Sequence, residues 1–156
     1  MAGQQTGAGA VLNIAKPSTQ DSVLIAGLGG VGMAALMACA SLGLKTVIAV
    51  DLIESRLELV GIANIQCPTQ LLLTGNKAKD LGATHTINAR EVDTTEEALR
   101  LTNGQGVKFA IECTGVPKVA KGVFEAVGKR GTMVQVGDCG IGELSIKVNS
   151  TEVIAS

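Results

Sequence analysis

The sequence predicts an α/β domain in which a doubly wound parallel sheet is covered by helices on both faces. Short segments rich in Val and Ile alternate with segments of helical composition, and this alternation is typical of right-handed strand–helix–strand units. Hydrophobic residues make up 46% of the 156 residues, whereas aromatic residues make up only 1%. The core must therefore consist of Ala, Val, Ile and Leu, which suit strands buried on both faces.

Turn residues separate the expected elements. A short apolar helix over 8–15 should stop before Pro17, because proline cannot continue it. Gly43 should end the second helix, and Asn103 and Gly104 should cap a later one. The expected strands are 22–26, 46–50, 85–88, 107–113 and 132–136. The expected helices are 8–15, 33–42, one beginning near Glu54, 95–102 and 118–127.

Charge and cysteine content exclude several classes of protein. The 13 basic and 14 acidic residues are interspersed, for a net charge of −1, whereas nucleic-acid binding needs clustered Lys and Arg. The cysteines form no C-x-x-C pair, which argues against a zinc ribbon. We expect reduced thiols in a cytoplasmic protein, since no signal segment precedes the domain. The cysteines are Cys39, Cys67, Cys113 and Cys139.

An uncharged run imitates a membrane span. The run extends from Val23 to Leu44, which is long enough to cross a bilayer. Glycines crowd its first half, however, and no Trp or Tyr flanks it. A strand, a tight turn and a buried helix explain the same composition, so we expect no membrane segment.

A glycine-rich turn within this run predicts a dinucleotide-binding loop. Residues 27–32 read Gly-Leu-Gly-Gly-Val-Gly, and this G-x-G-x-x-G motif is specific when it follows a strand and opens an apolar helix. Gly27 permits the tight turn, Gly29 lets the backbone approach a pyrophosphate, and Gly32 lets helix and strand pack closely. The free N–H groups and the dipole at the helix start favour phosphate.

An acidic residue at the end of the second strand predicts the ribose contact. Asp51 lies 19 positions after Gly32, where a carboxylate can accept hydrogen bonds from the adenosine ribose. The carboxylate would repel a 2′-phosphate, so we expect NAD rather than NADP. The alternative is that Asp51 only caps the next helix. Arg56 is either a cofactor contact or an exposed helix charge.

Two further strand ends should line the same crevice, because ligands of such sheets bind beyond the carboxyl ends of the strands. Thr114 follows the fourth strand, and Val136 and Gly137 end the fifth. The alternative is that they are ordinary loop residues. We expect no chemical role for His85, which starts a strand, and we interpret Cys113 as a packed thiol.

Several stretches together resemble the medium-chain dehydrogenase/reductase family, especially its zinc-type alcohol dehydrogenases of the aryl-alcohol (benzyl alcohol) branch. The stretches are QTGAGAVLNIAKP, VLIAGLGGVGMAALM, VIAVDLIESRLEL, AKDLGATHTINA, FAIECTGVP and GTMVQVG. The resemblance implies a Rossmann fold from an oxidoreductase that transfers a hydride between a primary alcohol and NAD, with zinc as Lewis acid. It also implies that Thr6 and Val31 back the nicotinamide ring. The cofactor positions that it implies are Thr6, Gly27, Gly29, Gly30, Val31, Gly32, Asp51 and Arg56.

The chain also departs from the family pattern. We expect the N-terminal domain that carries zinc ligands in the family to be absent, and Ala2 stands where the resemblance puts a zinc-binding Cys. We therefore expect no zinc site and no dehydrogenase activity from this chain alone. The Rossmann sheet should be truncated after 145–149, a segment that resembles the strand pairing subunits into homo-oligomers. The rival interpretations are a non-catalytic NAD-binding module and a fragment that does not fold.

Residues 60–77 form an atypical insertion in the helix that should run from ESRLEL into AKDLGATH. The insertion contains Pro68 and carries no charge before Lys77, which is unusual for a surface helix. Either a translated, unspliced intron or a lineage-specific loop would explain it.

A methyltransferase that uses S-adenosylmethionine would also place an acid after the second strand, but the complete glycine motif and the resemblance favour a dinucleotide.

Overall fold

The structure is a computed structural model that describes residues 2–59 and 81–138. The insertion at 60–77 and the segment 145–149 lie outside these residues. The described residues form a five-stranded parallel sheet of order β3-β2-β1-β4-β5. The strands are β1 (Ser22–Ala26), β2 (Thr46–Asp51), β3 (His85–Asn88), β4 (Val107–Glu112) and β5 (Val127–Gln135).

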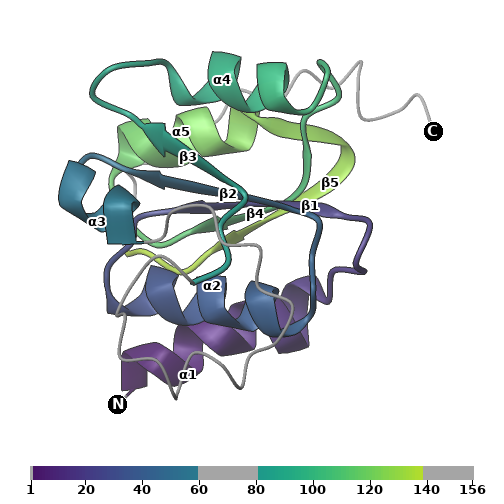
Figure 1. Ribbon diagram of the computed structural model, residues 1–156, viewed down its shortest axis with the longest axis vertical. Helices are drawn as coiled ribbons and strands as arrows, with labels where there is room; N and C mark the ends of the chain where they lie inside the picture. The colour runs from purple at the N-terminus through teal and green to yellow at the C-terminus, as the bar shows by residue number, and fades with distance from the viewer. Residues whose placement is uncertain (1, 60–80, 139–156) are drawn as a thin grey trace.

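Helices cover both faces of this sheet, as Figure 1 shows: α1 and α2 lie on one side, and α4 and α5 lie on the other. The predicted doubly wound α/β fold is thereby confirmed, with the chain order reversing between β1 and β4. The helices are α1 (Ala2–Gly9), the π-helix η1 (Ala10–Ala15), α2 (Gly30–Ser41), α3 (Glu54–Leu59), α4 (Thr94–Leu101) and α5 (Pro117–Glu125).

The first helical segment starts earlier than predicted. The expected helix at 8–15 proves to be the end of a longer one, because α1 begins at Ala2. The reason is tertiary: a side chain on Gly7 would overlap the carbonyl of Val31, so the missing Cβ lets α1 pack directly on α2. Small residues that carry no helical periodicity thus become helical through packing.

The last strand is longer than predicted and starts five residues earlier than the expected 132, at Val127. Its pairing with β4 contains a register shift, and Arg130 adopts a φ of +57° there. Such a bulge interrupts the alternation of apolar and polar residues by which a strand is predicted from sequence. The preceding helix correspondingly ends at Glu125 rather than at the predicted 127.

The central strands β1, β2 and β4 are largely buried on both faces, which divides the core into two layers. Val23 and Ile25 face the layer beneath α1 and α2, whereas Leu24 and Ala26 face the layer beneath α4 and α5. The uncharged run that imitated a membrane span consists of β1, the glycine turn and α2. Of the described helices, none has the length and apolar character to cross a bilayer.

One helix cap gives a direct test of this architecture. Asp93 precedes α4, and its Oδ1 accepts a hydrogen bond from the Glu96 N–H at 3.0 Å. We expect Asp93→Ala to lower the free energy of unfolding by about 1 kcal/mol, because the helix start loses its acceptor. Urea denaturation measures this change, with the exposed Lys118→Ala on α5 as control. Equal stability of Asp93→Ala and wild type would contradict the cap.

Candidate functional site

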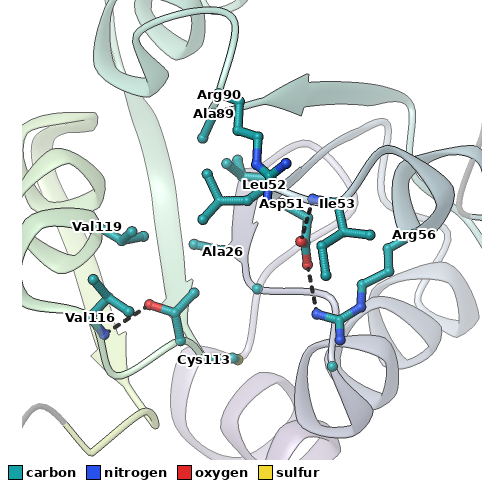
Figure 2. A pocket seen from close by; sticks show the side chains of 14 residues that line it. Ala26, Asp51, Leu52, Ile53, Arg56, Ala89, Arg90, Cys113, Val116 and Val119 are labelled. Atoms are coloured by element: carbon teal, nitrogen blue, oxygen red, sulfur yellow. Dashed lines mark hydrogen bonds and ion pairs between the residues drawn. The ribbon is translucent and has the colours of Figure 1, made fainter.

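A cleft of about 370 Å³ opens at the carboxyl ends of β1, β2 and β4. It lies where the strand order reverses, which is the position at which open α/β sheets bind ligands. Five residues predicted from the sequence line it, namely Gly27, Gly29, Asp51, Arg56 and Thr114. Figure 2 shows the cleft with the residues of β2 and its following turn opposite Val116 and Val119.

The glycine loop combines tight packing at its ends with open space at its centre. Gly27 has a φ of +89°, and a Cβ on Gly32 would overlap the Gly27 carbonyl. By contrast, nothing lies within 4 Å of the Cβ positions of Gly29 and Gly30. No side chain caps the start of α2, so the first N–H groups of this helix face the open space in front of the loop.

Asp51 links the loop to the second strand. It is 7% exposed, and its Oδ2 accepts the Leu28 N–H at 2.7 Å while its Oδ1 accepts the Ile53 N–H at 2.9 Å. The Arg56 and Leu57 N–H groups at the start of α3 donate to the Ile53 carbonyl, so Asp51 contacts this helix through the Ile53 N–H in the turn before it. A carboxylate has about four acceptor positions, and Leu28, Ile53 and Arg56 occupy three of them, which leaves room for a ribose hydroxyl.

Two arginines flank this carboxylate. The Nη1 of Arg56 lies 3.5 Å from Asp51 Oδ2, and the Arg56 side chain is 43% exposed; Figure 2 shows this ion pair. Arg56 therefore lines the cleft and also remains a half-exposed helix charge. Arg90, which the sequence analysis missed, lines the cleft just beyond the end of β3. The strand-end rule could have found Arg90, because it applies to every strand of the sheet.

Apolar side chains form the remaining walls of the cleft. Leu52 and Ile53 lie on one side, and Val116 and Val119 lie on the other. Leu52 is 43% exposed and Val116 is 45% exposed, so both present apolar surface that a flat aromatic ring could cover. The sequence analysis missed these residues because an isolated aliphatic in a loop carries no signal of its own.

The other predicted site residues lie outside this cleft. Gly30, Val31 and Gly32 form the first turn of α2, and Thr6 lies on α1 next to the close contact between Gly7 and Val31.

Val136 and Gly137 follow β5, and their N–H groups donate to the Glu112 carbonyl at 2.8 and 2.9 Å. The end of β5 therefore lies beside the end of β4, although neither residue lines the cleft.

Cys39 is buried and Cys113 is partly buried in the wall of the cleft, and both thiols should be unreactive. Burial raises the pKa of Cys39 to about 12, and burial together with the neighbouring Glu112 raises the pKa of Cys113 to about 12. The thiol form therefore dominates at neutral pH, and thiolate is the reactive species. We expect both to resist iodoacetamide in the folded chain and to react after denaturation, as measured by peptide mapping. Rapid alkylation of folded Cys113 would contradict the raised pKa of its thiol.

Other features of the described residues offer no competing chemistry. His85 starts β3, and its Nδ1 lies 2.9 Å from the Thr84 hydroxyl, away from the carboxyl ends of the strands. No three His, Cys, Asp or Glu side chains within 2–59 and 81–138 are placed to hold a metal ion. A second cleft of about 570 Å³, lined partly by Asp21 and Lys108, lies at the opposite end of β4.

Comparison with known proteins agrees with this geometry. Residues 74–155 match the family model described as zinc-binding dehydrogenase. The chain is 34% identical over 139 residues to alcohol dehydrogenase class-2 isozyme 2 of Oryctolagus cuniculus, covering 88% of this chain and 30% of that protein. It is 37% identical over 124 residues to alcohol dehydrogenase 1 of Pisum sativum, covering 78% of this chain and 28% of that protein.

Solved structures are similar over nearly the whole chain. The alcohol dehydrogenase zinc-binding domain protein from Burkholderia ambifaria has a TM-score of 0.78 and 39% identity, covering 97% of this chain and 35% of that one. Benzyl alcohol dehydrogenase from Acinetobacter calcoaceticus has a TM-score of 0.77 and 36% identity, covering 97% of this chain and 36% of that one.

Sheet order, glycine loop and acidic strand end together define a Rossmann-type dinucleotide domain. The chain belongs to the zinc-binding dehydrogenase family, and it is similar to part of the zinc-type alcohol dehydrogenases of the medium-chain dehydrogenase/reductase family. The predicted resemblance is thereby confirmed. The chain spans about 30% of the length of the curated relatives that it matches.

Proposed function

We propose that this chain binds NAD(H) at the cleft formed by the glycine loop and the end of β2. One observation carries the proposal: the buried Asp51 carboxylate is hydrogen-bonded to Leu28 within the loop, and open space lies directly over Gly29 and Gly30. N–H donors for a phosphate and a carboxylate acceptor for a ribose are thus held next to each other. A dinucleotide needs both groups at this spacing.

Each part of the cofactor has a counterpart in this arrangement. The pyrophosphate would accept the N–H groups at the start of α2, and the adenosine ribose would donate to Asp51. The adenine would lie between the apolar side chains of Leu52 and Val116. Asp51 would repel a 2′-phosphate, which favours NAD over NADP.

The nicotinamide half would extend away from the adenosine cleft. The resemblance places Thr6 and Val31 behind the nicotinamide ring. Thr6 precedes Gly7, which packs against the Val31 carbonyl where α1 meets α2. Val136 and Gly137 lie beyond β5, at the same edge of the sheet. We therefore assign these four residues to the nicotinamide side.

For the full-length protein we propose hydride transfer between a primary alcohol, aromatic in its preferred form, and NAD. The support is the likeness to proteins named alcohol dehydrogenase and benzyl alcohol dehydrogenase. Bound NAD would supply the hydride acceptor. The described residues do not fit a catalytic zinc ion, because they place no cluster of suitable ligands together. The described residues therefore do not supply the group that would activate the alcohol.

We also propose that the full-length protein is cytoplasmic and able to form homo-oligomers.

Fluorescence titration with NADH tests the proposed binding. The chain contains neither Trp nor Tyr, so protein emission does not obscure that of the nicotinamide. We expect a saturable change in NADH emission, competition by NAD, and weaker binding of NADPH. An absence of saturable binding by a cooperatively folded chain would refute the proposal.

A second candidate function is a non-catalytic NAD-binding module, which the lack of a metal-binding cluster among the described residues favours. An assay of the purified chain with benzyl alcohol, NAD and added zinc tests whether this chain is catalytic on its own. We expect saturable NADH binding without NAD reduction from this chain. Steady NAD reduction would instead show that the chain itself is catalytic.

A further inference from the structure

Glu112 ends β4 with a fully buried side chain, an unfavourable place for a carboxylate unless it is hydrogen-bonded. Its Oε1 accepts hydrogen bonds from the Thr114 hydroxyl and from the Thr114 N–H, the latter at 2.7 Å. Both carboxylate oxygens also lie 3.2 Å from the Gly115 nitrogen. No lysine or arginine among the described residues forms an ion pair with Glu112. Donors of the loop after β4 therefore stabilise its charge.

These hydrogen bonds fix the side chain of Thr114. The Thr114 hydroxyl donates to Glu112 and accepts the Val116 N–H at 3.0 Å. With the hydroxyl held in this way, the methyl carbon Cγ2 lies 2.7 Å from the position that a Cβ on Gly27 would take. Thr114 thus contacts the first glycine of the loop through its methyl group, while its hydroxyl is hydrogen-bonded within the protein.

Glu112 also contacts the end of β5. Its carbonyl accepts the N–H groups of Val136 and Gly137. A Cβ on Gly137 would stand 2.7 Å from Glu112 Oε2, so this carboxylate occupies the space that a side chain there would need. One residue therefore connects the glycine loop, the loop after β4 and the loop after β5. Every one of these segments contains residues that we assign to the cofactor.

We propose that Glu112 is a positioning residue for the dinucleotide. By fixing Thr114 against Gly27 and by accommodating Gly137, it sets the spacing between the glycine loop and the two strand-end loops. Glu112 does not itself line the cleft, so it acts through these neighbours. The inference rests on the proposed function, because the dinucleotide is the ligand that the three segments would share.

Two substitutions separate positioning from simple filling of the core. Glu112→Gln keeps a carbonyl oxygen for the Thr114 donors, whereas Glu112→Leu keeps a similar volume without an acceptor. Glu125→Gln is the matched control, because Glu125 is a half-exposed acid on α5 that pairs with Lys121. Each protein is titrated with NADH, and amide hydrogen exchange is measured without ligand.

We expect Glu112→Leu to weaken NADH binding at least about tenfold, since small misplacements of binding groups cost this much or more. Glu112→Gln should restore most of the affinity, and Glu125→Gln should bind like wild type. Without ligand, Glu112→Leu should lose exchange protection at Thr114 and Gly115, while the amides of β1 stay protected.

Wild-type affinity in Glu112→Leu would overturn the positioning role, as would a Glu112→Gln variant that binds no better than Glu112→Leu. Loss of protection throughout β1 would assign Glu112 to general stability and would also overturn it. A wild-type chain that fails to bind NADH refutes the proposed function itself and this inference with it. The wild-type titration therefore distinguishes the two failures.

Discussion

Replacement of Gly32 by alanine is expected to prevent stable folding of the chain. The new methyl group would overlap the Gly27 carbonyl oxygen, and neither backbone can move, because Gly27 donates its N–H to the Val50 carbonyl at 2.8 Å. We expect a loss of more than about 4 kcal/mol, above the roughly 1–3 kcal/mol usual for overpacking, because the methyl meets backbone atoms rather than a flexible side chain. Circular dichroism and urea denaturation measure the effect.

Glycines at the centre of the same loop provide the matched control. A methyl on Gly30 meets no atom within 4 Å, so Gly30→Ala should fold at least as well as wild type, since alanine favours helix by about 1 kcal/mol. The same methyl enters the space assigned to the pyrophosphate, so NADH affinity should fall. Equal stability of Gly32→Ala and Gly30→Ala would contradict the described packing.

Replacement of Asp51 by asparagine is expected to change both the affinity for the cofactor and the preference between cofactors. The amide retains one oxygen for the Leu28 or Ile53 N–H but loses the charge that would hold the ribose hydroxyls. Hydrogen bonds to a charged group contribute about 1.5–3 kcal/mol, so the Kd for NADH should rise about tenfold or more. The disadvantage of NADPH should shrink, because the repulsion of its 2′-phosphate is removed.

Titrations with NADH and NADPH measure both effects. Glu125→Gln controls for the loss of an acid, because Glu125 lies on α5, outside the cleft, and pairs with Lys121. Unchanged affinity for both nucleotides in Asp51→Asn would contradict the assignment of the ribose site. An equal loss for both would leave the ribose contact intact but remove Asp51 as the source of selectivity.

The parts of the fold that local sequence determines were predictable. The strands at 22–26 and 85–88 have the predicted bounds, because branched aliphatic residues between turn residues favour buried strands. The glycine loop was predictable because its spacing expresses the geometry of a single turn. Asp51 was predictable because its place follows from the length of one strand–helix–strand unit.

Features that depend on tertiary packing were not predictable. The start of α1 depends on the contact of Gly7 with Val31, and the start of β5 depends on the positive φ of Arg130. The buried role of Glu112 was not predictable either, because a charged residue within VKFAIEC is typical of an exposed strand position. Thr114 and Gly115 donate its hydrogen bonds. An acid two residues before Thr-Gly at the end of a strand is therefore the sequence pattern that would indicate such a buried carboxylate.

The central claim is that a dinucleotide binds where the glycine loop meets the end of β2. NMR titration of the ¹⁵N-labelled chain with NADH tests it most directly, because each backbone amide reports its own surroundings. The largest shifts should fall on residues 28–32 and on Leu52 and Ile53, and they should saturate together. Shifts confined to the second cleft, around Gly104 and Lys108 at the opposite end of β4, would contradict the assigned site.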